Sequence, residues 1–213
     1  MKTRERIIIT SLELFNNEGE PNVTTVDIAN ELDISPGNLY YHFKGKEIII
    51  EEIFSRFEKS ITEILSAQLD DKVDIEDSWF YLFVVFEEIF AYRFFYYNLT
   101  DIMQRYDNIN KKFKRIIKLK LSTANTILHK LTQASMLSIS EDDIEVLANN
   151  IVLVLTYWAS YTRLQKQLAD DEAMHSGVFQ VMSLVAPHLA EGRQGFYEEC
   201  RRLYQHVLND RVL

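Results

Sequence analysis

Cysteine, proline and glycine are all scarce in this chain of 213 residues, which contains one cysteine, three prolines and six glycines. The single cysteine, Cys200, excludes an internal disulfide and favours a reducing compartment, with a bridge to another chain as the alternative. The chain has few helix-breaking residues and many leucine, isoleucine, glutamate and lysine residues. This composition favours helix over sheet. We therefore expect an all-α protein.

A long hydrophobic run is also missing. The longest uninterrupted apolar segment, WFYLFVVF at residues 79–86, is far shorter than the roughly 20 residues that span a bilayer. The N-terminal segment MKTRERIIITSLELF is interrupted by Glu13 and lacks the cleavage site of a signal peptide. We expect a soluble, cytoplasmic protein with no membrane partner.

An excess of positive charge is absent too, because the net charge is −9. This acidity excludes a general nucleic-acid coat, although a small basic face can still act locally. The sequence shows no Cys/His cluster, no Gly-x-Ser-x-Gly, no phosphate loop and no dinucleotide fingerprint. We expect neither an enzyme nor a metal or other cofactor.

What the sequence does contain begins with a helical pattern near the N-terminus. Ile8, Ser11, Leu12 and Phe15 fall on one face of a helix. Gly19 follows, a residue free to take the left-handed conformation that ends helices. The first helix is therefore expected to stop there.

Two short helices are predicted next. Thr24 and Thr25 can cap the first of them, and Asp33 tolerates a left-handed turn after it. Ser35 can cap the following helix, with Pro36 at its first position. The order helix, helix, tight turn, helix predicts a helix-turn-helix domain over residues 1–47.

The segment SPGNLYYHFKGK, residues 35–46, carries the strongest functional signal. If Leu39 and Phe43 face inward, their neighbours on this helix point outward. Tyrosine, histidine and lysine side chains suit phosphates and sugars, and a glycine allows close backbone approach. We predict DNA contact by Gly37, Asn38, Tyr40, Tyr41, His42, Lys44 and Lys46. The alternative is that the tyrosines pack against a second domain and that Lys46 caps the next helix.

The run IANELDISPGNLYYHFKGK, residues 28–46, resembles the DNA-binding domain of the tetracycline-repressor (TetR) family of bacterial transcription factors, and the likeness extends over residues 4–50. The resemblance implies that Thr25 touches the DNA backbone and that Ser35, Pro36, Gly37 and Asn38 lie at or near base edges. Tyr40, Tyr41 and His42 would contact phosphates and sugars, and Lys46 would hold a phosphate. It also implies that Lys2, Arg4 and Arg6 can form a basic N-terminal arm.

Two positions depart from the family pattern. Asp33 stands where the family usually has glycine, which would strain the turn slightly. Val26 stands where some members have a base-reading arginine, so base recognition would rest more on residues 35–42. Residues 1–48 also carry more acids than bases.

Residues 48–213 are expected to form a larger helical domain, with helices at 46–69, 75–97, 101–106, 110–131, 141–168, 172–189 and 194–209. The resemblance implies that this domain binds a small effector and dimerises. The helix that starts at residue 75 carries aromatic residues on all of its faces. These are more aromatic residues than a single buried stripe requires. A large apolar pocket is one explanation, and ordinary core is the other. The candidate ligand-binding residues are Trp79, Phe83, Phe86, Phe90, Arg93, Phe94, Tyr97, Met103, Asn125, Tyr157, Trp158 and Tyr161. An elongated hydrophobic or aromatic effector would fit them better than a charged one.

The last long helices are the candidates for self-association. Residues 145–164 and 177–189 carry more apolar surface than one stripe needs, and two such helices per subunit would build a four-helix interface. The alternative is that they bury each other within one subunit. The basic run at residues 111–120 is predicted to be the solvated face of an amphipathic helix rather than a second nucleic-acid site.

Together these patterns predict a homodimeric transcriptional regulator. It would bind a palindromic double-stranded DNA operator, as a repressor released by a small, largely hydrophobic effector. The competing hypothesis is a helical ligand-binding or interaction protein whose DNA-binding head has become vestigial. The acidity of residues 1–48 favours that alternative, and the intact residues 40–46 oppose it.

Overall fold

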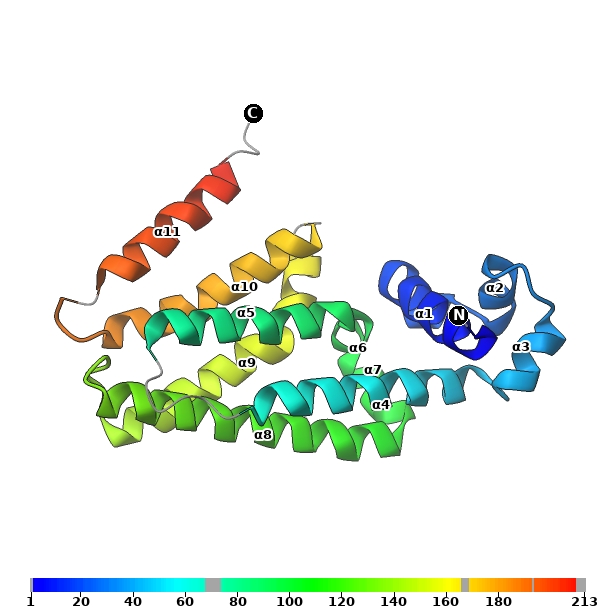
Figure 1. The fold of residues 1–213 in the computed structure, drawn as a ribbon, viewed down its shortest axis with the longest axis horizontal. Helices are drawn as coiled ribbons and strands as arrows, with labels where there is room; N and C mark the ends of the chain where they lie inside the picture. Colours follow the sequence, from blue (N-terminus) through cyan, green and yellow to red (C-terminus); the bar gives the residue numbers. More distant parts are fainter. Residues whose placement is uncertain (1, 68–73, 166–168, 193, 210–213) are drawn as a thin grey trace. The chain divides into compact units, whose positions relative to one another are not determined.

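The structure, a computed structural model, describes residues 2–67, 74–165, 169–192 and 194–209, and this part of the chain is helical without a β-strand (Figure 1). The expected all-α class is confirmed. Two compact units can be distinguished, Met1–Ser60 with Tyr92–Phe113, and Ile61–Ala91 with Lys114–Leu213. We call them the head unit and the bundle unit.

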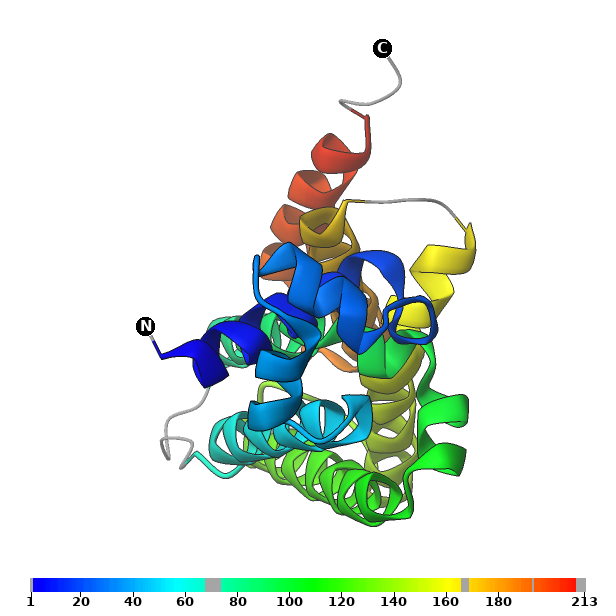
Figure 2. The same ribbon diagram turned by 90° about the vertical axis from the view of Figure 1, so that its right-hand side faces the viewer.

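The head unit gathers the N-terminal helices with two short helices from later in the chain (Figures 1 and 2). Its elements are α1 (Thr3–Glu18), η1 (Glu20–Asn22), α2 (Thr25–Glu31), α3 (Pro36–His42), most of α4 (Lys46–Leu65), α6 (Arg93–Tyr97) and α7 (Leu99–Arg105).

The predicted capping residues Thr24 and Ser35 mark the starts of α2 and α3. Thr24 and Asp27 form a reciprocal capping box at the start of α2, and the Ser35 hydroxyl accepts from the Asn38 N–H at 3.2 Å. Asp33 takes a positive φ of 52° in the turn, and Gly19 takes 87° after α1. The helix-turn-helix therefore forms although an aspartate stands where glycine would be unstrained.

Aromatic packing fills the core of the head unit. Phe15 of α1 lies 5.3 Å from the ring of Phe94 in α6, and Phe54 lies 5.2 Å from Phe95. The Phe94 N–H donates to the Asn16 side chain at 3.1 Å, which satisfies a free donor near the start of α6. The single helix predicted over 75–97 is therefore two helices, because residues 94–96 turn into this core.

The bundle unit packs long helices beside one another. It contains α5 (Ile75–Ala91), most of α8 (Asp107–Gln133), α9 (Glu141–Gln165), α10 (Asp170–Val185), η2 (Ala186–His188) and α11 (Gln194–Asn209). Helix α10 lies against α5, α9 and α11 (Figures 1 and 2). A Cβ added to Gly177 of α10 would come within 2.6 Å of both Phe86 and Trp158, so glycine permits this close approach.

The compact units do not follow the predicted boundary after residue 47. The head unit also takes the first part of α4 and the α6–α7 segment, because the aromatic core described above joins them.

The predicted helix ends at residues 69 and 168 lie outside the described residues. Among the helices that the structure describes, none combines the length and apolar character needed to cross a membrane.

Candidate functional site

Helix α3 presents a polar and aromatic surface. Leu39 and Phe43 are buried, each with 1% exposure, whereas Tyr40 and Tyr41 are 57% and 77% exposed. Residues 35–38 at the start of the helix are exposed as well. The phase predicted from the four-residue spacing of Leu39 and Phe43 is confirmed, so α3 offers its outer face to a partner.

Positive charge and rings are organised on this surface. The Lys44 ammonium lies 4.6 Å from the centre of the Tyr40 ring, and Tyr41 packs edge-on to His42 at 5.2 Å. An open hollow lies beside them, lined by residues from the starts of α2, α3 and α4, among them Thr25, Gly37 and Lys46. Free N–H groups at the starts of helices favour anions, so the hollow suits a phosphate group. Glu47 also lines the hollow, and its carboxylate opposes an anion.

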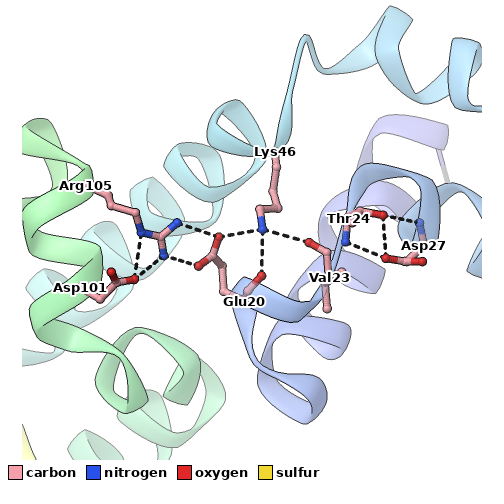
Figure 3. Close-up of polar contacts among 7 residues, drawn as sticks. All are labelled: Glu20, Val23, Thr24, Asp27, Lys46, Asp101 and Arg105. Carbon is pink, nitrogen blue, oxygen red and sulfur yellow. Dashed lines mark hydrogen bonds and ion pairs between the residues drawn. The ribbon is translucent and has the colours of Figure 1, made fainter.

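A buried carboxylate organises the head unit behind this surface (Figure 3). Glu20 is fully buried and accepts from Arg105 of α7 through both carboxylate oxygens. The Lys46 ammonium lies 3.0 Å from Glu20 Oε1 and donates to the backbone carbonyls of Glu20 and Val23 at 2.9 and 3.0 Å. Burial by itself raises the pKa of Glu20, but the hydrogen bonds from Arg105 and Lys46 outweigh it and hold the pKa below the ordinary value.

An apolar cavity of about 60 Å³ lies inside the bundle unit. Side chains of α4, α5, α8, α9 and α10 line it, and its polar exceptions are Ser78, Tyr81, Lys120 and Thr123. This volume exceeds the ~10–15 Å³ that one water needs. It is well below the ~300–1,000 Å³ of usual small-molecule sites, so a ligand of ordinary size must widen it.

Lys120 is the unusual member of this lining. Its side chain is 1% exposed, and its ammonium donates to the Leu155 carbonyl at 3.4 Å. Burial lowers the pKa of Lys120 to about 7. Among the described residues, no group of three or more His, Cys, Asp or Glu side chains could hold a metal ion.

Two family models match the chain over most of its length. The model for "Bacterial regulatory proteins, tetR family" matches residues 7–53, and the model for "Bacterial transcriptional repressor" of the same family matches residues 56–196. The chain belongs to the TetR family. Its function as a transcriptional regulator follows from this membership.

Solved structures and curated relatives agree with the TetR assignment. A TetR-family transcriptional regulator from Marinobacter aquaeolei VT8 is 35% identical with a TM-score of 0.84, covering 97% of this chain and 98% of that one. The SmeT–triclosan complex shares 18% identity and a TM-score of 0.57 over 90% of this chain and 93% of that one, a likeness of fold alone. The regulator TtgW of Pseudomonas putida is 32% identical over 78 residues, 37% of this chain and 55% of that protein, so the chain matches about half the length of this relative.

The predicted DNA-contacting residues of this TetR-family head are brought together, with one change of role. Thr25 and residues 35–42 lie on or beside the exposed face of α3. The ammonium of Lys46 instead bonds inside the head unit, because the buried Glu20 carboxylate needs cations around it. Lys46 is thus a structural residue of the head in this conformation, in addition to any contact with DNA.

The predicted basic arm is wrong for its two arginines. Arg4 and Arg6 belong to α1. Arg4 pairs with Glu52 at 3.0 Å and lies 4.7 Å from the centre of the Phe43 ring, while Arg6 donates to the Leu32 carbonyl at 3.3 Å. These contacts favour the helical conformation over an extended arm, because they give both guanidinium groups hydrogen-bond acceptors within the head unit.

The structure does not place the twelve predicted ligand-binding residues around one cavity. Arg93, Phe94, Tyr97 and Met103 belong to the head unit, and the other eight belong to the bundle unit. None of the twelve lines the apolar cavity described above. Ligand binding by these residues therefore stays a prediction, and most of their rings pack as core or against neighbouring helices.

The individual contacts explain this outcome. Phe86, Phe90 and Phe94 are buried in the cores of their units. Trp79 packs on Phe196 and Phe83 packs on His175, with ring centres 5.0 and 4.9 Å apart.

The polar candidates likewise have nearby partners. Arg93 donates to Asn17 at 3.2 Å, and Asn125 donates to the Leu121 carbonyl at 3.0 Å. Trp158 donates to the Ala173 carbonyl at 2.8 Å, which ties α9 to α10. Tyr157, Trp158 and Tyr161 line a separate open hollow, to which α10 and α11 also contribute residues.

Two polar residues that are buried inside the TetR fold, Glu20 and Lys120, are not expected there from the sequence. The amphipathic pattern predicts that the basic run at 111–120 faces solvent, but Lys120 is buried. The signal was available, because Lys120 lies four residues after Ile116 and four before Ala124 on the buried stripe of α8. Glu20 carried no comparable signal, since its partner Arg105 lies 85 positions away.

Proposed function

We propose that the protein is a repressor that binds a palindromic DNA operator as a homodimer and is released when a small, largely hydrophobic molecule occupies the bundle cavity. The observation that carries the DNA-binding part is the outer face of α3. Two large tyrosines there are 57% and 77% exposed on a helix held by buried Leu39 and Phe43. Exposed neighbouring aromatic side chains are costly unless a partner covers them.

The chemistry of this face fits the major groove. Exposed Gly37 and Asn38 lie in the first turn of α3, where side chains and backbone can reach base edges. Tyr40, Tyr41, His42 and Lys44 follow and suit phosphates and sugars. The SmeT–triclosan complex and the family model described as a repressor support an effector and a repressing role.

Helix α9 supports the homodimer. Its exposed apolar residues are Val146 at 59%, Leu153 at 58%, Tyr157 at 49%, Tyr161 at 47% and Leu164 at 87%. They recur at helical spacing and form an apolar stripe. By contrast, α10 buries most of its apolar residues within its own chain. The proposed interface therefore rests on α9 more than on the two helices expected from the sequence.

Occupancy of the cavity provides the proposed release. A ligand of ordinary size must widen the cavity of about 60 Å³, so it binds a changed arrangement of the surrounding helices. Helices α4 and α8 each begin in the head unit and end in the bundle unit, so they connect the cavity walls to the head. Operator binding places the site of action on the chromosome, in the cytoplasm.

The first test is selection of bound fragments from genomic DNA by the purified protein, followed by titration of the enriched sequence against salt. An inverted repeat, bound with an affinity that falls steeply with salt, is the expected result. Tyr41→Ala should weaken binding about thirtyfold, because each of the two subunits loses a contact that contributes about 1 kcal/mol. The matched control is Phe80→Ala, which removes an exposed ring of α5 and should bind as the parent protein does.

Two outcomes would contradict this proposal. If no sequence is enriched at low salt, with or without candidate effectors, the head is vestigial and ligand binding is the whole function. If Tyr41→Ala binds the enriched sequence as tightly as Phe80→Ala, the outer face of α3 does not contact DNA.

A further inference from the structure

Lys46 takes part in two sites of the head unit. Its ammonium lies 3.0 Å from Oε1 of the buried Glu20 (Figure 3). The same residue, at the start of α4, lines the open hollow beside the outer face of α3. The proposed function assigns this hollow to a phosphate of DNA. The charge of Lys46 therefore stands between a buried carboxylate and the place of an incoming anion.

The three N–H donors of the Lys46 ammonium have acceptors inside the head unit. The backbone carbonyls of Glu20 and Val23 accept at 2.9 and 3.0 Å, and Glu20 Oε1 is the third acceptor. What Lys46 offers a phosphate in the hollow is therefore its positive charge rather than a further hydrogen bond.

Glu20 by itself would cancel that charge. Its carboxylate is fully buried, so water screens it little, and it lies in direct contact with the ammonium. Glu47 also lines the hollow and adds a negative charge. A head that held only the Glu20–Lys46 pair would attract a phosphate weakly.

Arg105 of α7 changes this balance. Its guanidinium donates to both carboxylate oxygens of Glu20, so Glu20, Lys46 and Arg105 together carry one net positive charge. Asp101 also pairs with Arg105, but the Asp101 side chain is 57% exposed, so water screens its charge more than that of Glu20. One positive charge beside the hollow is therefore left uncompensated.

We propose that Arg105, which lies outside the helix-turn-helix, sets the affinity of the head for DNA phosphates by neutralising Glu20, so that the charge of Lys46 acts on the DNA backbone. The proposal rests on the proposed function, which assigns the hollow to a phosphate. Arg105 is not among the residues that line the hollow, so it acts through Glu20 and Lys46 and not by touching DNA. Helix α7 thereby carries a charge on which DNA binding depends.

The test is titration of the selected operator with the full chain and its variants in about 0.05–0.3 M salt. Arg105→Gln removes the neutralising charge and should weaken binding about tenfold at the lowest salt, with a smaller loss at the highest. Arg105→Lys keeps the charge and should recover most of that loss. Arg201→Gln is the matched control, because Arg201 is an exposed arginine of α11, and it should bind as the parent protein does.

A double variant separates charge from structure. Glu20→Gln combined with Arg105→Gln removes one charge of each sign and leaves Lys46 uncompensated. It should bind the operator within about twofold of the parent protein, although it lacks the buried ion pair. If Arg105 only held the fold together, a second substitution in the same cluster would not restore binding. Circular dichroism at the titration temperature gives the folded fraction of each variant, and affinities are expressed per folded protein.

Two results would overturn the inference. One is a double variant that binds as weakly as Arg105→Gln, and the other is a loss in Arg105→Gln that is the same at every salt concentration. If the double variant does not fold, Arg105→Gln and Arg105→Lys decide by themselves across the salt series. Equal weakening by these two variants would then reject the charge effect.

The outcomes separate the inference from the proposed function. If no operator is enriched, or if Tyr41→Ala leaves operator binding unchanged, the proposed function fails. Operator binding that depends on Tyr41 but is unchanged by Arg105→Gln would keep the regulator and reject the role of Arg105.

Discussion

Glu20 is a fully buried carboxylate whose two cationic partners come from different elements of the head unit (Figure 3). A buried charge is stable only when its partners satisfy it, and removing one partner costs more than the pair contributes. Lys46 and Arg105 therefore join η1 to the start of α4 and to α7. The geometry of the head depends on all three side chains.

Lys46→Met should lower the free energy of unfolding by about 1–3 kcal/mol, because Glu20 and two backbone carbonyls lose a donor inside the protein. Urea unfolding followed by circular dichroism measures this change. Lys44→Met is the matched control, since Lys44 is exposed and lies over Tyr40, and it should be nearly neutral. Equal stability of the two variants would show that the Lys46 contacts contribute little.

The lowered pKa of Glu20 also predicts behaviour in acid. Its contribution to stability is present above the ordinary value of 4.5 and is lost as pH falls through the lower value of the folded state. Glu20→Gln should therefore be less stable than the parent at neutral pH, and the difference should narrow below about pH 4.5. Denaturant unfolding at a series of pH values checks this, and a constant difference would contradict it.

Lys120 predicts a pH dependence of the same sign at higher pH. Since its pKa is lowered to about 7 by burial, the unfolded chain binds more protons between that value and the ordinary 10.5, so stability rises with pH there. Lys120→Met should stabilise the ligand-free protein by about 1–4 kcal/mol near pH 6. The gain should shrink toward pH 10, and thermal unfolding at both ends of this range measures it. A gain that does not change with pH would contradict the buried charge.

Among the helices, the packing of α10 on α5 and α9 depends on one small residue. A Cβ at Gly177 would lie 2.6 Å from the Phe86 and Trp158 rings, both of which are held within the bundle unit. Overpacking of this kind costs about 1–3 kcal/mol, so Gly177→Ala should lower the melting temperature. Gly195→Ala in α11 is the control, because nothing lies within 4 Å of its added Cβ. A Gly177→Ala variant as stable as this control would show that the rings move aside easily.

The short helices α6 and α7 belong to the head unit, although the helix that precedes them in the sequence, α5, belongs to the bundle unit. Residues 92–113 follow α5 in the sequence but pack with the N-terminal helices, and Arg105 of α7 reaches Glu20. A change in α7 therefore acts on the buried carboxylate of Glu20.

At the scale of the whole molecule, self-association should depend on the apolar stripe of α9. Leu153→Glu places a charge at a position that is 58% exposed in one chain and that the proposed dimer would bury. We expect it to convert the dimer to a monomer, as measured by sedimentation. Phe80→Glu is the control at another exposed apolar position, 72% exposed on α5, and should remain dimeric. A dimeric Leu153→Glu variant would place the interface elsewhere.

The sequence by itself determined the features that depend on near neighbours along the chain. The capping residues Thr24 and Ser35 act within three positions, and the spacing of Leu39 and Phe43 sets which face of α3 is exposed. These signals predicted the helix-turn-helix, its outward tyrosines and the family. They are reliable because a cap or a helical face needs no distant partner.

Only the tertiary structure decided which polar groups are buried and which space stays open. Glu20 is buried because Arg105 reaches it from 85 positions away, and Lys120 is buried because α5, α9 and α10 cover its helix. The aromatic run predicted as a pocket became core for the same reason, since each ring found a partner far along the chain. Desolvation and packing depend on neighbours in space, and the order of residues does not name those neighbours.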